Sequence, residues 1–403
     1  MGECLPADRG TSSGRRLALV ISSSATPSGN GTGTVMSNLL QQFGRREVAL
    51  VCSYWVRGPR ITWSSQWPRR LYGMIRVQGG RGERWVRLVQ LPFLFVVSLL
   101  AAVINRCSVV MVVYPVEEFL LVGYLVSVLT RRPLLPYFLN TYLDANQRGF
   151  TRWLQPRVFR RAKQVIVMSE GMKRLFSARY PDLSCQVLTH SHNISIPDAD
   201  RLPSPPVHAP VRLVMIGTIN ATNQDASARI LSVIGRGQEF TLTVFTAQRP
   251  GELARLGLDE SLMHLRRVPY EALITQIMEH DIVLHPHGIT GDVSEVELRT
   301  IFPTRTIEYL LSCRPILAHV PADSYIGEFY RQHECALVVS QPDPGAIRSA
   351  LDRLVNDGAL RSTLVRNALR AAQAFRADKV ALVLRELLRK AANQADRQGG
   401  RPA

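Results

Sequence analysis

Short apolar runs alternate with longer helix-like stretches along both halves of this chain, and no other feature limits the fold as strongly. Short apolar runs bounded by turn residues are typical of buried strands. We expect strands in the first half at residues 17–22, 47–53, 109–114, 134–139 and 164–168. We expect strands in the second half at residues 211–217, 240–245, 265–268, 282–285, 316–318 and 336–340. Strands that alternate with helices predict an α/β fold with two doubly wound parallel sheets.

The length of 403 residues exceeds that of a usual single domain, which favours two domains. Residues 197–210 contain five prolines, a composition typical of a stiff linker. We therefore expect a first domain at 1–196, a linker at 197–210 and a second domain at 211–376. Residues 377–403 are expected to form the end of the C-terminal helix and a tail.

The net charge of +17 and the pI near 10.2 predict an acidic partner, which could be nucleic acid, an anionic membrane or a phosphorylated substrate. Nucleic acid is disfavoured because no recognition motif supports it. The six cysteines are scattered without a C-x-x-C pair, so neither a zinc site nor a disulfide framework is expected. With no signal peptide visible, reduced thiols in the cytoplasm are the expected state.

Residues 88–105 form an uncharged run close to the roughly 20 residues that span a bilayer. Gln90, Pro92 and Ser98 interrupt it, so a buried or membrane-surface helix is favoured over a true span. The preceding residues 69–87 hold six arginines together with aromatic residues. Such a segment suits docking on anionic lipid, although a solvated basic face fits the pattern equally well.

Residues 302–318, FPTRTIEYLLSCRPILA, read as a short helix followed by a buried strand. Pro303 suits the first turn of a helix at residues 304–312. That helix would place Arg305 and Glu308 on neighbouring surface positions. A basic side chain at a helix N-terminus can bind phosphate, and a carboxylate one turn later can accept bonds from sugar hydroxyls. An ordinary surface ion pair is the alternative.

This stretch resembles the FPSK-x-x-EYL-x-x-G-x-PV-x-A segment of retaining glycosyltransferases of the GT-B fold, in glycosyltransferase family four. Thr304 stands at the Ser of that pattern, Arg305 at its Lys and Glu308 at its Glu, while Cys313 replaces the usual Gly. In that family the basic residue contacts the donor diphosphate and the Glu contacts the ribose. The first Glu of the family's E-x7-E pair is replaced by Thr300, and Glu295 or Glu297 could substitute only in a shifted loop.

Two glycine-containing turns resemble other parts of the same fold. Gly29, Gly31 and Gly33 lie where the first strand would turn into a helix near Thr34, as in the Gly-rich first loop that covers the donor. The turn Gly217-Thr218 would approach the donor phosphates. The Arg and Lys that commonly follow this turn in the family are absent here.

The segment VPYEALITQIMEHDIVLHPH resembles the part of the family that contacts the nucleotide base. It contains Tyr270, and it ends at His287, which could bind substrate or could be an ordinary loop residue. The donor-binding residues implied by the resemblance are Gly31, Gly33, Gly217, Thr218, Tyr270, His287, Thr304, Arg305, Thr306 and Glu308.

Asp144 follows the fourth predicted strand, at the edge where parallel sheets bind ligands. Related enzymes carry a His or Asp in this region, so Asp144 is the candidate catalytic residue, with a helix cap as the alternative. His190 and His192 could suggest a metal, but no carboxylate stands at ligand spacing, and we expect no metal site and no cofactor.

The resemblance implies transfer of a sugar, of hexosyltransferase type, from a nucleoside diphosphate sugar to an acceptor hydroxyl with retention at the anomeric carbon. The first domain would then face the acceptor and the second would bind the nucleotide sugar. The basic charge adds the expectation of a cytoplasmic enzyme, peripheral on the inner face of the plasma membrane, that builds a cell-surface polysaccharide on a glycan or lipid-linked acceptor. The alternatives are a GT-B epimerase and a non-catalytic GT-B protein that binds a nucleotide or a partner transferase.

Overall fold

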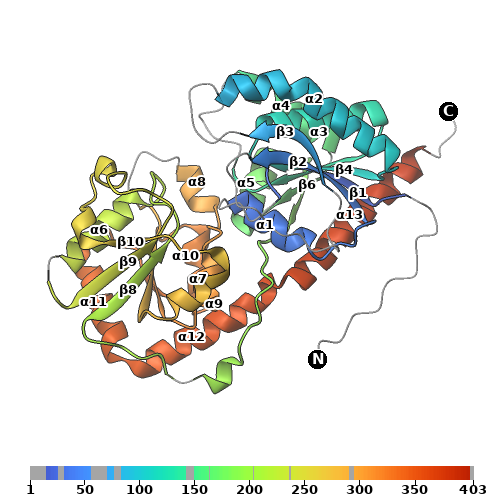
Figure 1. The fold of residues 1–403 in the computed structure, drawn as a ribbon. Coiled ribbons are helices and arrows are strands. Elements are labelled where there is room, and N and C mark those ends of the chain that lie inside the picture. The colour runs from blue at the N-terminus through green and yellow to red at the C-terminus, as the bar shows by residue number, and fades with distance from the viewer. Residues whose placement is uncertain are drawn as a thin grey trace.

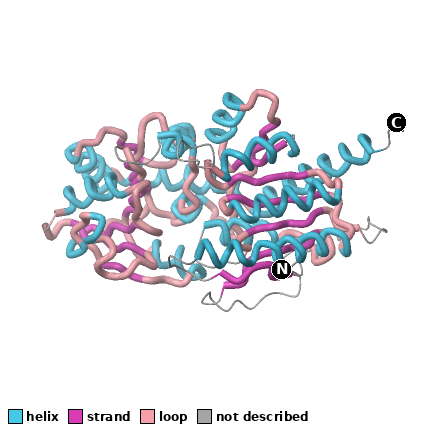
Figure 2. The backbone as a smooth tube through the Cα atoms, turned by 90° about the horizontal axis from the view of Figure 1, so that it is seen from above, coloured by secondary structure: helices cyan, strands magenta, loops and turns pink. Residues whose placement is uncertain are grey.

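The computed structural model describes residues 15–25, 31–55, 70–76, 83–141, 149–162, 164–202, 204–235, 237–289 and 295–399. Two separate parallel sheets form the centres of two domains (Figure 1). Helices lie on both sides of the strands in each domain (Figure 2). Because both faces of each sheet are covered, the central strands are apolar along nearly their whole length, which is why they stand out in the sequence.

The first sheet has seven strands in the order β3-β2-β1-β4-β5-β6-β7. Its strands are β1 (Ala18–Ser22), β2 (Val48–Trp55), β3 (Arg70–Arg76), β4 (Val109–Tyr114), β5 (Leu134–Phe138), β6 (Gln164–Val167) and β7 (Ser184–Val187). All five residues of β1 are buried, and β1 pairs with both β2 and β4. The strand order reverses beside β1, so the ligand crevice of this sheet is expected at its carboxyl end.

The helices of the first domain are α1 (Gly31–Leu40), α2 (Glu83–Ile104), α3 (Glu117–Thr130), α4 (Phe150–Ala162) and α5 (Glu170–Arg179). Helices α2, α3 and α4 pack beside one another as a layer, while α1 packs with the C-terminal helix. Ser169 caps α5, since its hydroxyl accepts a hydrogen bond from the Met172 amide at 3.0 Å.

The second sheet has six strands in the order β10-β9-β8-β11-β12-β13. Its strands are β8 (Val211–Ile216), β9 (Phe240–Phe245), β10 (His264–Arg266), β11 (Ile282–Pro286), β12 (Ile316–His319) and β13 (Leu337–Val339). Its helices are α6 (Gln224–Ile234), α7 (Tyr270–Ile277), α8 (Glu295–Thr300), α9 (Thr306–Leu311), α10 (Tyr325–Gln332), α11 (Pro344–Asn356) and α12 (Gly358–Ala372). Single 3-10 turns are η1 (Ala199–Arg201), η2 (Ala254–Leu256), η3 (Glu260–Leu262) and η4 (Gln373–Phe375).

The C-terminal helix α13 (Ala377–Gly399) runs from the second domain onto the first (Figure 1). Its Arg385 guanidinium pairs with the Glu47 carboxylate at 2.9 Å, beside the end of α1. The helix starts where the His192 and Arg376 backbones bridge, with the Ala377 amide donating to the His192 carbonyl at 2.9 Å. The chain therefore passes between the domains twice, and both passages are hydrogen-bonded to each other.

An aromatic cluster fills the space between the two domains. The ring of Phe302 lies 5.0 Å from that of Phe329 and 5.5 Å from that of Phe375. From the first domain, His190 Nε2 is 3.0 Å from the Phe302 carbonyl oxygen, and the Ser169 hydroxyl donates to the Thr300 carbonyl at 2.6 Å. The segment that begins at Phe302 is thus anchored to both domains.

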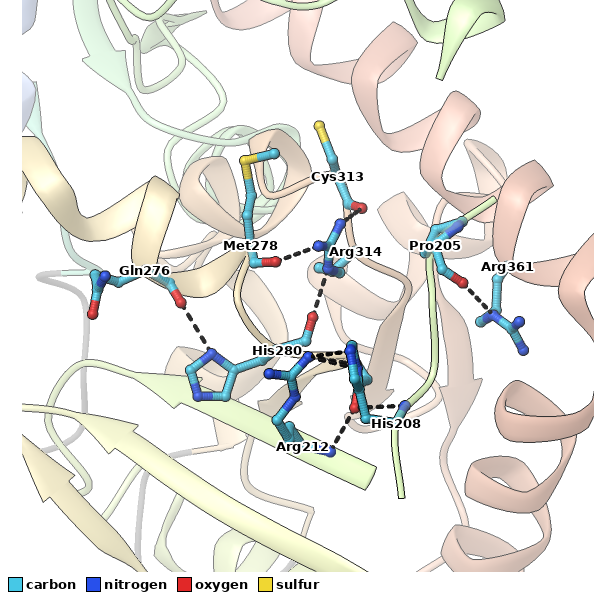
Figure 3. A network of polar contacts seen from close by, with 10 residues as sticks. Pro205, His208, Arg212, Gln276, Met278, His280, Cys313, Arg314 and Arg361 are labelled. Carbon is cyan, nitrogen blue, oxygen red and sulfur yellow. Dashed lines mark hydrogen bonds and ion pairs between the residues drawn. The ribbon is translucent and has the colours of Figure 1, made fainter. Parts of the chain in front are cut away.

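The linker is fastened to the amino ends of the second sheet by a polar network (Figure 3). His208 Nδ1 lies 2.6 Å from Asp281 Oδ1, and the Arg212 amide donates to Asp281 Oδ2 at 2.7 Å. Arg361 Nε donates to the Pro205 carbonyl at 3.1 Å. This network lies at the end of the sheet opposite to the carboxyl ends, so it holds the linker without touching the ligand edge.

Three sequence expectations were wrong in detail. The helix expected at 304–312 is α9, which begins only at Thr306 and spans six residues, with Arg305 at its N-cap. Residues 377–403 were expected to hold only the end of the C-terminal helix, but all of α13 lies there, because η4 separates it from α12. Strand β3 was not expected at all, since its arginine-rich sequence resembles a surface segment.

Candidate functional site

The carboxyl ends of the two sheets meet at residues 302–308. From the first domain, Gly31, the first residue of α1, lies beside this segment. A Cβ atom placed on Gly31 would lie 3.2 Å from Thr304 Cγ2 and 3.3 Å from its hydroxyl oxygen. A side chain at Gly31 would therefore push α1 and Thr304 apart, which explains glycine here. Gly31 and Gly33 belong to the first turn of α1, so the expectation of a loop as far as Thr34 was wrong.

Arg305 lies over the turn that follows β8. Its guanidinium donates to the Ile216 carbonyl at 3.1 Å and to the Thr218 carbonyl at 3.4 Å. Gly217 has φ of +90°, and a Cβ there would lie 3.5 Å from Arg305 Cζ. A guanidinium carries five N–H donors, so these bonds fix its plane and leave N–H groups for an anion. The structure thus brings Arg305, Gly217 and Thr218 together.

Glu308 is buried, with 7% of its surface exposed, in the first turn of α9. Burial raises the pKa of its carboxyl to about 7. Its Oε1 accepts a hydrogen bond from the Tyr270 hydroxyl at 3.2 Å, and its Oε2 has no partner among the described residues. A buried carboxyl oxygen without a donor is costly, so this atom is suited to accept bonds from ligand hydroxyls.

Tyr270, the first residue of α7, connects Glu308 to the first domain. Burial raises the pKa of its hydroxyl, and the nearby Glu308 carboxyl adds to the rise. The same hydroxyl hydrogen-bonds to the side chain of Asn38 in α1, whose amide nitrogen also donates to the Ser191 carbonyl at 2.8 Å. Sequence reasoning missed Asn38, because nothing local marks a polar residue inside an apolar helix as a site residue.

The histidines near the second sheet are interior groups. His287 is 2% exposed, its Nε2 lies 2.9 Å from the Leu298 carbonyl, and burial lowers its pKa to about 4. His285 is fully buried, and its Nδ1 lies 2.6 Å from the Tyr330 hydroxyl. Both rings are therefore neutral. His287 fastens α8 to the end of β11 behind Arg305, and its ring does not open onto solvent.

The positions that differ from the family pattern have structural partners here. Thr300 is buried, and its hydroxyl donates to the Val296 carbonyl at 2.7 Å. Glu295 is exposed and lies 3.6 Å from Arg299. Arg229 donates to Asp225 at 2.6 Å and to His319 at 3.0 Å, so its charge is engaged within the second domain. Arg305, by contrast, bonds directly to the carbonyls of the β8 turn.

Three further sequence predictions have different outcomes. Thr306 is fully buried at the start of α9, beneath Arg305. Asp144, the candidate catalytic residue, lies outside the described residues. His190 and His192 do not face each other as metal ligands would, since their Nε2 atoms bond to the carbonyls of Phe302 and Ala372 at 3.0 and 3.1 Å. Within the described ranges, no cluster of three or more His, Cys, Asp or Glu residues could hold a metal.

Comparison with known proteins identifies the fold. Neither a protein-family model nor a curated protein sequence matches this chain. Among solved structures, the sucrose-phosphate synthase of Thermosynechococcus elongatus is similar, with a TM-score of 0.65 at 16% identity over 93% of this chain and 99% of that one. Anabaena HepE in complex with UDP-glucose has a TM-score of 0.65 at 15% identity over 93% of this chain and 99% of that one.

The lipopolysaccharide outer core galactosyltransferase WaaB is also similar, with a TM-score of 0.57 at 12% identity over 95% of this chain and 99% of that one. These neighbours are GT-B glycosyltransferases, and the likeness extends over both domains. The chain therefore has the GT-B fold, which confirms the fold predicted from the sequence.

Proposed function

We propose that this protein is a glycosyltransferase that moves a sugar from a nucleoside diphosphate sugar to an acceptor hydroxyl. One observation carries the proposal: Arg305 lies over the Gly217 turn, and one helical turn away the buried Glu308 has an oxygen with no hydrogen-bond partner among the described residues. The guanidinium suits a diphosphate, and the carboxylate suits a pair of ribose hydroxyls. The fold it shares with HepE, whose structure holds UDP-glucose, supports a uridine nucleotide as the first to test.

In this mechanism Arg305 stabilises the charge that develops on the diphosphate as the sugar leaves. Its two bonds to the carbonyls of Ile216 and Thr218 hold the guanidinium in place before the donor arrives, so little reorganisation is needed during the reaction. Tyr270 holds Glu308 Oε1, which leaves Oε2 for the ribose. The contact of Gly31 with Thr304 brings the first domain, and with it the acceptor side, against the donor.

The finer parts of the proposal follow the sequence resemblance. We propose that the enzyme is related to glycosyltransferase family four, transfers a hexose and retains the anomeric configuration, with Asp144 as the candidate catalytic residue. We further propose that it acts in the cytoplasm, at the inner face of the plasma membrane, in the synthesis of a cell-surface polysaccharide. The acceptor would be a glycan or a lipid-linked sugar.

The test is thermal stabilisation of the wild type and of Glu308→Gln by UDP, GDP, ADP and their sugars. Glu386→Gln, on the exposed side of α13 and paired with Lys390, is the matched control. We expect one nucleotide to raise the midpoint of the wild type and of the control but not of Glu308→Gln. NMR of the product made from that donor then reports the anomeric configuration. If no nucleotide shifts the folded wild type, the proposal fails.

A non-catalytic nucleotide-binding protein is the second candidate. Two observations favour it: Thr300 occupies the position of the family's first Glu, and Arg229 is engaged by Asp225 and His319. It predicts binding of a nucleotide without turnover of any nucleotide sugar, either by transfer or by slow hydrolysis. Release of nucleotide from the bound donor by the wild type, and not by Arg305→Ala, would exclude this candidate.

A further inference from the structure

Helix α2 carries an apolar stripe on its outward side. The stripe consists of side chains three or four residues apart, with exposed fractions of 71% for Trp85, 79% for Val89, 58% for Phe93, 48% for Val96, 52% for Leu100 and 53% for Val103. Residues at this spacing fall on one face of a helix, so the stripe is continuous over about 27 Å. The sequence has no charged residue between positions 88 and 105, so nothing interrupts it.

The opposite side of α2 is built into the first domain. Leu94, Ser98 and Ala102 are fully buried where the helix packs on β3 and α3. The Gln90 side chain binds both backbone groups of Ile75, accepting from its amide at 2.6 Å and donating to its carbonyl at 3.1 Å. The Gln90 side chain thereby forms hydrogen bonds that a further strand would otherwise make with the edge strand β3. Pulling α2 away would expose the sheet and break these bonds.

By length and composition α2 could cross a membrane. Its residues Trp85–Ile104 have a mean hydropathy of 2.2, and only 22% of its most apolar window is buried inside the protein. An apolar helix inside a soluble core would be mostly buried, whereas this helix buries one side and exposes the other. A helix fixed along a sheet on one side, and apolar on the other, can enter a bilayer only sideways, at the depth of its outward face.

Basic and aromatic residues surround the stripe. Beyond its carboxyl end lie exposed Arg106 and Arg131, together with exposed Leu129 of α3. In the neighbouring α4 the rings of Phe150 and Trp153 stack at 5.7 Å, and the Arg157 guanidinium lies 4.2 Å over Trp153. Acidic residues are scarce in this layer of α2, α3 and α4: within 83–141 and 149–162 the sequence has only Glu83, Glu117 and Glu118. The layer is therefore apolar at its centre and positive at its margin.

We propose that the outward face of α2 docks on an anionic lipid bilayer, with the helix axis in the plane of the membrane. The apolar stripe would enter the boundary between headgroups and acyl chains, and the arginines would meet the lipid phosphates. A second copy of the chain fits this face less well. In a symmetric pair the arginines at the margin would meet a layer in which acidic residues are scarce, so they would find few partners of opposite charge.

The docking orients the site, and this part rests on the proposed function. Helix α2 follows β3 and precedes β4, so its amino end, with Trp85, lies at the carboxyl edge of the first sheet. In Figure 1 that end of α2 is on the side turned towards the second domain. An enzyme lying on α2 would hold the carboxyl edge of its first sheet beside the membrane. Its acceptor would then be a sugar on a lipid anchor rather than a soluble glycan.

The experiment is sedimentation of the full-length protein with vesicles of phosphatidylcholine alone and of phosphatidylcholine mixed with phosphatidylglycerol. The test variant is Phe93→Glu with Val96→Glu, which places two charges in the stripe and leaves the buried side unchanged. The control is Leu382→Glu, because Leu382 is 63% exposed on α13, outside this layer. Thermal midpoints with and without nucleotide verify that each variant is folded and keeps its donor site.

We expect the wild type and Leu382→Glu to sediment with the phosphatidylglycerol vesicles, more weakly at high salt, and the test variant to lose about tenfold or more in affinity. Absence of wild-type binding, or equal binding by the test variant, overturns the proposal. A lipid-free dimer that the test variant dissociates would instead make this face a contact between copies. Nucleotide binding without vesicle binding rejects only the docking, and vesicle binding without nucleotide binding rejects only the transferase.

Discussion

Two buried carboxylates lie at opposite ends of the second sheet, and their surroundings differ. Asp281, before β11, accepts from the Arg212 amide at 2.7 Å and from the His208 amide at 3.3 Å, and its other oxygen lies 2.6 Å from the His208 ring. Burial raises the pKa of Asp281, but these bonds outweigh it and leave the pKa lowered. Glu308 has the Tyr270 hydroxyl on one oxygen and no described partner on the other, and its pKa is raised to about 7.

The comparison shows that burial alone does not decide the charge of a carboxyl group. The number of donors aimed at it does, since each bond to the ionised form offsets part of the desolvation. Asp281 is fully satisfied by the protein and holds the linker in place. Glu308 is left with unused acceptor capacity, as expected of a group that completes its bonds with a ligand.

The largest expected effect is on catalysis at the ligand end of the sheet. Arg305→Ala should lower kcat/KM about 100-fold or more, because it removes a charge-assisted donor from the leaving diphosphate. The measurement is transfer from the donor that the thermal screen identifies. Arg255→Ala, an exposed arginine of η2, is the control. Equal kcat/KM for Arg305→Ala and the wild type would remove Arg305 from the mechanism.

The largest effect on stability is expected at the linker end. Asp281→Asn should lower the free energy of unfolding by about 3 kcal/mol, since the new amide N–H group faces donors that the carboxylate accepted. Urea denaturation measures it. Asp352→Asn, at a half-exposed ion pair with Arg348, should change the free energy by less than about 0.5 kcal/mol. If Asp281→Asn proves as stable as the wild type, the contrast between the two carboxylates is lost.

The stability contributed by Glu308 and that contributed by Asp281 should change with pH in opposite directions. Because the pKa of Glu308 is about 7 in the folded protein and 4.5 is its ordinary value, the folded state binds the extra proton between these values. Stability contributed by Glu308 therefore falls as pH rises through this window, by up to about 3 kcal/mol. The lowered pKa of Asp281 acts oppositely, and its contribution is lost as pH falls through that pKa.

Denaturation of the wild type and of Glu308→Gln at about pH 5 and about pH 8 tests this sign. Glutamine stays neutral at both pH values. The free energy of unfolding of Glu308→Gln should therefore rise relative to that of the wild type at the higher pH, and the two values should lie closer together at the lower pH. A gain of equal size at both values would mean that the folded carboxyl does not take up a proton in this window.

The smallest effect is expected from Tyr270→Phe, which removes one donor from Glu308. The affinity for the nucleotide should fall about tenfold, because the carboxylate loses the bond that orients it. Tyr180→Phe, whose ring packs against Phe159 at 4.8 Å, is the control. Calorimetric titration with the nucleotide measures both variants. An unchanged affinity would show that α9 alone positions Glu308.

The elements that the sequence predicts best are those decided by local chemistry. The bounds expected for β4 and β9 are those observed, because β4 is an uninterrupted apolar run and β9 begins with apolar residues that alternate with threonines. Local chemistry also caps α11, where the Asp343 carboxylate accepts from the amides of Gly345 and Ala346 at 3.0 Å. Strand β3 escaped prediction because it is an edge strand, selected by its pairing with β2 rather than by its own composition.

The residues of the candidate site also fall into those that the sequence predicts and those that only the structure reveals. Residues 302–308 stand out in the sequence by their motif, and Cys313, at the family's Gly position, has a φ of +53° that glycine adopts more easily. Asn38 and the donor-free oxygen of Glu308 could not be found in the sequence. The bonds that reveal them join residues far apart, as Arg305 joins Ile216 across 89 positions.

The sequence by itself determined the alternation of strands and helices, the two sheets and the segment that carries Arg305 and Glu308, because periodicity and motif are properties of neighbouring residues. Only the tertiary structure decided which buried carboxyl is satisfied and which is open to a ligand. It also decided that the apolar run at 88–105 buries one side on β3 and α3 and exposes the other. The physical reason is that desolvation and hydrogen bonding depend on every atom that surrounds a group, and the fold gathers those atoms from distant parts of the chain.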